Sequence, residues 1–200
     1  MQFLWDHDIR CIYQPLYADT TKKIGIYEFI KGEKISDILA SDIHYVTHFI
    51  SELYELSRHT ESSRFAPASA ACFSPQDVVD IIERRVSSLA EVSQNFSILT
   101  DFLSHDFVPS YRTLLQRNKE LCSSYGTSLS CPLSQDERIL SPSDFGFHNV
   151  LKRKSEELVF LDFEFFGWDD PAKMISDFVI HPGMNLSYEV QEEAGGIAQA

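Results

Sequence analysis

Apolar and polar residues alternate along the first part of the chain, which is the spacing of half-buried strands. The alternation runs through CIYQPLY and KIGIYEFI, and the polar segment ADTTKK lies between them. We therefore predict a β-hairpin or two neighbouring strands between Phe3 and about Ile30. Gly32 is expected to end the strand pattern and to open a helical one.

The next segments have the three- and four-residue spacing of amphipathic helices. One apolar stripe follows Ser41 and Asp42, either of which can cap a helix, and it continues to Leu56. A second helix is predicted from Ser74. Ser is a good N-cap there, the Pro that follows suits the first helical position, and Asp77 lies favourably in the first turn.

A third helical pattern starts at Phe96 and extends to Leu121, and we expect Pro109 to interrupt it. The segment SSYGTSLSCPLSQDE then predicts a loop. After this loop, the runs RIL, HNVLK and ELVFLDF are typical of short strands, and RKSE lies where a turn would join the last two into a hairpin.

A last helix is predicted from Asp170 and Pro171, and the sequence HPG at residues 181–183 should end it. Helices therefore come first along the chain, and a small hairpin sheet follows them. The expected fold class is α+β, mainly helical with a small β-hairpin.

The composition is that of a globular chain with one well-buried core, since 44% of its 200 residues are hydrophobic and 24% are charged. The formal charge of −13 argues against nonspecific binding to nucleic acid, which needs clustered Lys and Arg. The first residues do not resemble a secretory signal, and no apolar run approaches the roughly 20 residues of a membrane span. We expect a cytoplasmic protein with neither a nucleic-acid nor a membrane partner.

The cysteines give no sign of a metal or redox site. They have no CxxC spacing and no His-rich partner segment, and they stand at Cys11, Cys72, Cys122 and Cys131. This pattern predicts reduced, mostly buried thiols and gives no support to a zinc- or cysteine-dependent hydrolase.

Three oxygen-bearing side chains lie near the predicted hairpin. Asp144, in SPSDFGFHNVL, precedes the first strand, Asn149 follows five residues later, and Asp162 ends the second strand in LVFLDFEFFG. Strand pairing across RKSE should place Asn149 and Asp162 at the same end of the hairpin, where one divalent cation could bridge them. Such hard oxygen ligands suit Mg²⁺. Asp144 could then orient an attacking hydroxyl and accept its proton, as phosphoryl transfer requires.

On these residues the chain resembles the aminoglycoside phosphotransferase and choline kinase branch of the protein kinase-like fold. By that resemblance IYEFIKGEKI is the hinge between two lobes, SPSDFGFHNVL is the catalytic loop, and VFLDFEFFGWDDP is the magnesium-binding segment. Residues 1–30 would be a remnant of the N-terminal nucleotide lobe with its last strands. Residues 31–200 would be the helical C-terminal catalytic and substrate-binding lobe, truncated at its end.

The resemblance implies ATP-dependent phosphorylation of a hydroxyl on a small molecule, such as an aminoglycoside, a choline-like amine or a sugar, with ATP and Mg²⁺ as cofactors. Asp144 would be the catalytic base, and Asn149 and Asp162 would be the Mg²⁺ ligands. The adenine of ATP would contact the hinge backbone at three residues, Glu28, Phe29 and Ile30.

The sequence also departs from the family's pattern. Pro142 stands where relatives carry a His two residues before the catalytic Asp, and Gly146 replaces a second common His. The Gly-rich loop, strand Lys and helix Glu of the nucleotide lobe do not precede the hinge. A second hypothesis is therefore a catalytically inactive kinase-like module that binds a nucleotide or another ligand. An Asp and an Asn at this spacing can also simply cap a turn.

Polar residues near the proposed site have structural interpretations beside functional ones. Asp177 is expected to be a buried carboxylate that bonds the catalytic-loop backbone, with a solvated helix residue as the alternative. Glu164 could reach the metal or substrate, or it could form a surface ion pair. His148 is expected to be a packed, hydrogen-bonded histidine. Four more acidic residues could line a pocket for a cationic substrate or be solvated, namely Asp136, Glu137, Asp169 and Asp170.

Overall fold

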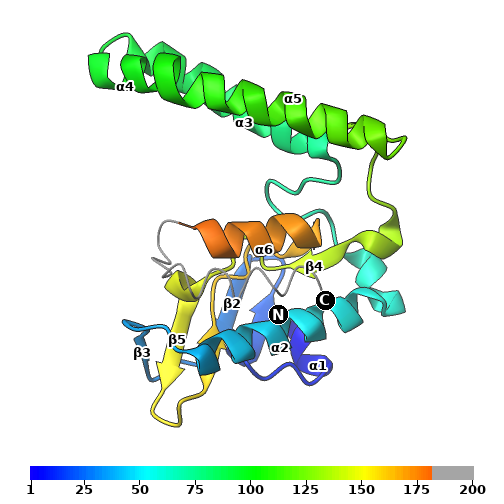
Figure 1. Cartoon of the computed structure of the whole chain (residues 1–200). Helices are drawn as coiled ribbons and strands as arrows, with labels where there is room; N and C mark the ends of the chain where they lie inside the picture. The colour runs from blue at the N-terminus through cyan, green and yellow to red at the C-terminus, as the bar shows by residue number, and fades with distance from the viewer. Residues whose placement is uncertain (182–200) are drawn as a thin grey trace. The chain divides into compact units, whose positions relative to one another are not determined.

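The computed structural model describes residues 1–181 of the chain (Figure 1). The fold is α+β, with a helical content of about 50% and small antiparallel sheets. The chain forms two compact units: unit 1 comprises Met1–Ala71 and the chain from Asp136 onward, and unit 2 comprises Cys72–Gln135. Residues 1–30 thus share a unit with the predicted catalytic hairpin, and the expected lobe boundary at residue 30 stays a prediction. No helix in the described part of the chain is long and apolar enough to cross a membrane.

Unit 1 begins with a short helix and a hairpin. Helix α1 (Gln2–Asp6) precedes β1 (Pro15–Asp19) and β2 (Ile24–Tyr27), which pair antiparallel and confirm the predicted hairpin. The expectation that the strand pattern starts at Phe3 is wrong, because a five-residue helix is too short to show a helical period. Its buried residues are Phe3 and Leu4.

A three-stranded antiparallel sheet contains the predicted catalytic hairpin. β5 (Val150–Arg153) pairs with β6 (Leu158–Phe160) across the RKSE turn, as predicted, and its other edge pairs with β3 (Gly32–Lys34). The expectation that Gly32 opens a helix is therefore wrong. A Cβ at Gly32 would lie 2.9 Å from the backbone oxygen of Lys152, so glycine allows β3 to approach β5.

Helix α2 (Ala40–Ser57) confirms the first predicted amphipathic helix, and the 3₁₀ helix η1 (Thr60–Arg64) follows it. The helix begins one residue before Ser41, and Leu39 occupies the N-cap position. Asp42 caps it from the first turn, because its buried carboxylate accepts a hydrogen bond from the backbone N–H of Leu39 at 3.0 Å. Ser41 is therefore not the cap.

A second small sheet joins β4 (Ile139–Ser141) to β7 (Gly167–Asp169) in antiparallel register. The sequence pattern predicts β4 but not β7, because three residues show no alternation and the pairing partner is distant in sequence. The predicted last helix is confirmed as α6 (Pro171–Ile180), where the Asp170 carboxylate caps the backbone N–H of Ala172 at 2.7 Å. Of the predicted stop sequence HPG, residues 182 and 183 lie outside the described residues.

The core of unit 1 is a cluster of aromatic rings. Phe49 of α2 stacks on Phe160 of β6 with ring centroids 4.6 Å apart, and Phe145 and Phe163 pack against Phe49 at 5.9 Å and 6.2 Å. Phe178 of α6 lies 5.2 Å from Phe145. All five rings are buried. The cluster therefore fixes the predicted catalytic loop between α2, the hairpin and α6.

Unit 2 is a pair of long helical segments that lie side by side (Figure 1). The first is α3 (Pro75–Ser93). The second runs without a break from α4 (Ser97–Asp101) through the π-helical turn η2 (Phe102–Phe107) into α5 (Val108–Ser124). The predicted interruption at Pro109 is wrong, because the helix continues through this residue, which directly follows the π-helical turn.

The start of α3 is the predicted one. The Ser74 hydroxyl accepts the backbone N–H of Asp77 at 3.2 Å, and the Asp77 carboxylate accepts the N–H of Ser74 at 2.9 Å. This reciprocal capping box satisfies two donors that the helix leaves without partners. The predicted loop over residues 123–137 is confirmed for residues 125–134, whereas Ser123 and Ser124 end α5 and the 3₁₀ helix η3 (Gln135–Glu137) forms its last part.

The cysteines are free thiols, as expected, but only one of them is buried. Cys72 is buried and Cys131 is exposed, while Cys11 and Cys122 are intermediate. The expectation of mostly buried thiols is therefore wrong. Burial raises the pKa of the Cys11 thiol to about 12, and the charge of Glu52 adds to this effect.

Candidate functional site

The loop between β4 and β5 brings Asp144 and Asn149 into contact. The Asn149 side-chain Nδ2 donates to the backbone oxygen of Asp144 at 3.0 Å and to its Oδ2 at 3.1 Å. The chain folds back through the 3₁₀ turn η4 (Phe147–Asn149), where the N–H of Asn149 donates to the carbonyl of Gly146 at 3.0 Å. The side chain of Asp144 is 48% exposed, so its carboxylate is anchored by the loop and still accessible.

His148 holds the other oxygen of the same carboxylate. Its Nε2 lies 3.0 Å from Asp144 Oδ1, and the ring stacks on His181 with centroids 4.1 Å apart. Because a carboxylate only accepts hydrogen bonds at neutral pH, Nε2 carries the proton. The prediction of a packed, hydrogen-bonded histidine at position 148 is confirmed, and both oxygens of Asp144 have a donor.

Asp162 lies at the end of the hairpin where Asn149 also lies. The backbone N–H of Leu161 donates to the carbonyl oxygen of Asn149 at 2.8 Å, and Asp162 follows directly. Its backbone adopts the left-handed region with φ 62°, which Asp tolerates better than most residues. Within residues 1–181 its exposed carboxylate forms no hydrogen bond or ion pair with Asp144 or Asn149. The register of the hairpin thus agrees with the prediction, and the side chains are not joined directly.

The side-chain oxygens of Asn149 and Asp162 at this end of the hairpin are of the kind that could ligate a hard cation. The Nδ2 of Asn149 faces Asp144, so its Oδ1 is the atom that could ligate a metal, and the Asp162 carboxylate is exposed. Mg²⁺ usually takes one or two carboxylates and completes its shell with phosphate oxygens and water. Asn149 and Asp162 could therefore hold Mg²⁺ together with a nucleotide, whereas they do not form an all-protein cage.

A second donor group overlaps this site. One ligand atom each of Asp144, His148 and His181 lies within 4.8 Å of the other two. Two imidazoles and a carboxylate suit Zn²⁺ or a similar borderline ion better than Mg²⁺. Binding there would displace the hydrogen bond between His148 and Asp144, so this group would compete with the use of Asp144 as a base.

The predicted adenine contacts at the hinge are only partly available. The backbone N–H of Glu28 already donates to the carbonyl of Gln14 at 2.9 Å, and its side chain pairs with Arg153 at 2.9 Å. Ile30 is buried, whereas the side chain of Phe29 is 84% exposed. The N–H of Glu28 is thus engaged, and a ligand at the hinge would have to use the other backbone groups.

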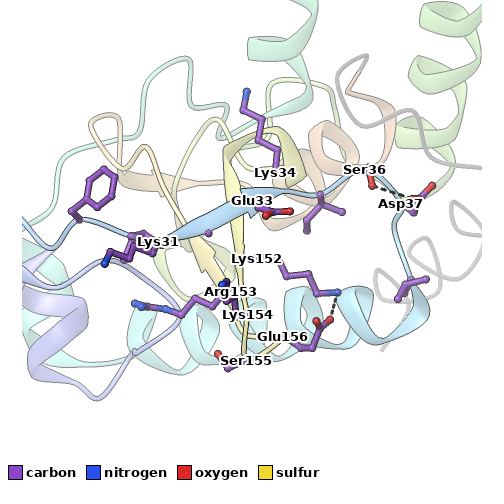
Figure 2. Close-up of a pocket in the computed structure, with 15 residues that line it drawn as sticks. Lys31, Glu33, Lys34, Ser36, Asp37, Lys152, Arg153, Lys154, Ser155 and Glu156 are labelled. Carbon is purple, nitrogen blue, oxygen red and sulfur yellow. Dashed lines mark hydrogen bonds and ion pairs between the residues drawn. The ribbon is translucent and has the colours of Figure 1, made fainter.

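A hollow of about 1430 Å³ lies beside the end of the hinge, β3 and the RKSE turn (Figure 2). Phe29 and Ile30 line it, but Glu28 does not. Its lining contains five cationic and three acidic side chains, which are Lys31, Lys34, Lys152, Arg153 and Lys154, and Glu33, Asp37 and Glu156. The pattern of apolar residues does not predict this hollow. A local excess of positive charge could favour an anionic ligand, even in a chain of strongly negative net charge.

Lys152 of this hollow is fixed by two carboxylates. Its Nζ lies 3.0 Å from Glu156 and 3.1 Å from the buried Asp42, and hydrogen bonds to these two residues raise the pKa of Lys152. The lysine therefore belongs to the structure that joins β5 to α2. Lys31, Lys34 and Lys154 form no ion pair within residues 1–181, which makes them the cations available to an anion.

The buried carboxylate near the site is Asp169, whereas Asp177 is 44% exposed. Lys173 joins them, with Nζ 3.1 Å from Asp169 and 2.8 Å from Asp177. Burial alone would lower the pKa of Lys173, yet its bonds to these two carboxylates raise it. The expectation that Asp177 is buried against the catalytic loop is wrong. Asp169 also does not line a pocket for a cationic substrate, because it is fully buried.

Comparison of the chain with family models, with curated proteins and with solved structures gave no match. The candidate site is therefore defined by this chain's own residues. It consists of Asp144, fixed by Asn149 and His148, with Asp162 at the same end of the β5–β6 hairpin.

Proposed function

We propose that this chain is the catalytic part of an ATP-dependent phosphotransferase with a protein kinase-like C-terminal lobe. It would transfer a phosphoryl group to a hydroxyl of a small molecule, such as an aminoglycoside, a choline-like amine or a sugar. The observation that carries the proposal is the accessible Asp144 carboxylate, which Asn149 holds at 3.1 Å and His148 at 3.0 Å. Asp162 supports it, because this residue lies at the same hairpin end.

Asp144 would act on the acceptor as a positioned base. Phosphoryl transfer requires little covalent chemistry from the protein, so orientation of the hydroxyl and removal of its proton are the main contributions of a carboxylate. The two donors from Asn149 and His148 restrict rotation of the Asp144 carboxylate and leave its exposed side for the acceptor. When bound, Mg²⁺ would neutralise charge on the phosphates, and Asn149 and Asp162 would hold it.

Replacement of the base tests this assignment. In Asp144→Asn, which keeps the size of the side chain, we expect turnover to fall by roughly 10²- to 10⁴-fold. The measurement is ADP production from MgATP by the full chain, with a panel of aminoglycosides, choline-like amines and sugars as acceptors. Asp106→Asn is the control, because Asp106 is an exposed residue of η2 in unit 2 that is not part of the candidate site. Turnover of Asp144→Asn within about threefold of wild type would remove Asp144 from this role.

The alternative function is a kinase-like module that binds a nucleotide or another ligand without turnover. One observation favours it: the backbone N–H of Glu28, at a predicted adenine contact, already donates to the carbonyl of Gln14. Calorimetry separates the two functions. Magnesium-dependent binding of ATP followed by ADP production supports the enzyme, whereas binding without ADP production under any acceptor supports the module.

A further inference from the structure

Two histidines and a glutamate of unit 1 form a cluster that shares no residue with the candidate site. His7 follows α1, His59 is the N-cap of η1, and Glu61 lies within η1. One ligand atom of each lies within 4.8 Å of the other two, although His7 is remote from the other two in sequence. The two imidazole rings meet edge to face with centroids 4.5 Å apart.

The hydrogen bond of His7 fixes a tautomer that a metal ligand can use. Its Nδ1 lies 2.8 Å from the carbonyl oxygen of Phe3, and a carbonyl only accepts, so Nδ1 carries the proton and Nε2 has a free lone pair. The ring of buried Phe3 packs against the imidazole with centroids 4.5 Å apart. Metal-binding histidines usually donate their second N–H to a carbonyl or carboxylate, which fixes both tautomer and orientation.

His59 and Glu61 are exposed and can adjust their positions. His59 Nδ1 accepts the N–H of Glu61 at 3.4 Å, which is a long and weak hydrogen bond, and the Glu61 carboxylate lies 3.5 Å from Arg64. Around a tetrahedral ion with bonds of about 2.1 Å, ligand atoms are about 3.4 Å apart. Rotation of the exposed His59 and Glu61 side chains could bring the three ligand atoms to this spacing while His7 stays in place.

We propose that His7, His59 and Glu61 bind a borderline divalent ion such as Zn²⁺, with water as the fourth ligand. Two histidines and one glutamate are a ligand set that proteins use for Zn²⁺. The ion would join the segment after α1 to η1. This site is independent of phosphotransfer and of the Asp144, His148 and His181 group.

The test is a calorimetric titration of the chelator-treated full chain with Zn²⁺ alone at pH 7.5. We expect one ion per chain, and we expect His7→Gln, His59→Gln and Glu61→Gln each to weaken binding at least about tenfold, since even outer-shell changes have effects of this size. His48→Gln is the matched control, because it is another exposed histidine of unit 1 that lies outside both groups. Co²⁺ in place of Zn²⁺ should give the visible absorption bands of tetrahedral nitrogen and oxygen coordination.

His148→Gln distinguishes this site from the group at Asp144. The proposal expects Zn²⁺ affinity within about twofold of wild type in this variant, and a loss of affinity that follows His148 instead of His7 would overturn it. No binding of Zn²⁺ to the wild-type chain at 100-fold excess would also overturn it. Glu61→Gln keeps the test valid even if His7→Gln unfolds α1, because Glu61 is exposed and, among residues 1–181, bonds only to Arg64 and the adjacent turn.

Discussion

Unit 1 and unit 2 differ in what their apolar residues contact. In unit 1, α2, the β5–β6 hairpin and α6 bury a shared cluster of aromatic rings. In unit 2, the buried hydrophobic residues among those described are only Cys72, Leu103 and Leu129, and Ile98 is 85% exposed. The same helical spacing thus predicts helices in both units, but it does not predict how far an apolar stripe is buried, which depends on partners distant in sequence.

This difference indicates two sources of stability. Unit 1 depends on long-range burial of large side chains, which contributes most of the free energy of folding in globular domains. Unit 2 buries few large side chains, so we expect a larger share of its stability to come from the capping box of α3 and from contacts between its two helical segments, such as the hydrogen bond from Tyr111 to Glu83 at 3.3 Å. Both candidate sites lie in unit 1, where the backbone that positions them is fixed by the core.

The largest effect should come from truncation of a core ring. Phe49→Ala removes a fully buried side chain that stacks on Phe160, and we expect a loss of about 3–5 kcal/mol in the free energy of unfolding. The measurement is urea unfolding followed by tryptophan fluorescence, because both tryptophans, Trp5 and Trp168, belong to unit 1.

The matched change in unit 2 is Phe102→Ala, since the side chain of Phe102 is 48% exposed. It should cost about 1 kcal/mol or less, as is usual for partly exposed positions, and far-UV circular dichroism is the measurement, because unit 2 contains no tryptophan. Equal losses for Phe49→Ala and Phe102→Ala would contradict the contrast between the units.

The next prediction compares the alkylation rates of one thiol from each unit. Because the pKa of Cys11 is raised to about 12, its thiolate is scarce at pH 8, whereas Cys131 is exposed. In variants whose single remaining cysteine is either Cys11 or Cys131, alkylation of Cys11 should be at least about 100-fold slower than that of Cys131 at pH 8. A raised pKa also means that the rate at Cys11 continues to rise with pH above 9. Rates within tenfold of each other would show that Cys11 is not protected.

The smallest effect concerns the cap of α3. Ser74→Ala removes the hydroxyl that accepts the N–H of Asp77 and should cost about 1 kcal/mol. Far-UV circular dichroism should detect this loss as an earlier loss of helix, while the tryptophan transition of unit 1 stays unchanged. Ser88→Ala, at an exposed position within the same helix, should change stability by no more than about 0.5 kcal/mol. A shift of the tryptophan transition by Ser74→Ala would mean that the units unfold together.

The sequence predicted those helices and strands whose period, cap or turn lies within the element itself. The helices α2 and α3 and the β5–β6 hairpin have a clear period and, for α3 and the hairpin, a clear cap or turn. Elements set by distant partners were missed: β3 forms because Gly32 allows close approach to β5, and β7 forms because it pairs with β4. The π-helical turn before Pro109 was missed because the helix accommodates the proline instead of ending.

For the site, the sequence did not predict the hydrogen bonds from Asn149 to Asp144, because they depend on how the loop folds back through η4. The hairpin register did give the position of Asp162 at the same end as Asn149. The engagement of the Glu28 N–H by Gln14 could not be predicted, because it depends on how the chain before β1 meets the hinge. The cluster of His7 with His59 could not be predicted from the sequence either, since only the fold brings α1 to η1.

We propose that Asp162 and Asn149 hold a cation together with ATP, and the affinity of Asp162→Asn for MgATP measures this role. Calorimetry at fixed Mg²⁺ should show affinity at least about tenfold weaker than wild type, as expected when a metal ligand loses its charge. Asp106→Asn is the control, because it makes the same charge change at an exposed residue of η2 in unit 2 that is not part of the candidate site, and it should bind MgATP within about twofold of wild type. Equal affinity of wild type and Asp162→Asn, or no binding of MgATP to the wild-type chain, would contradict the account.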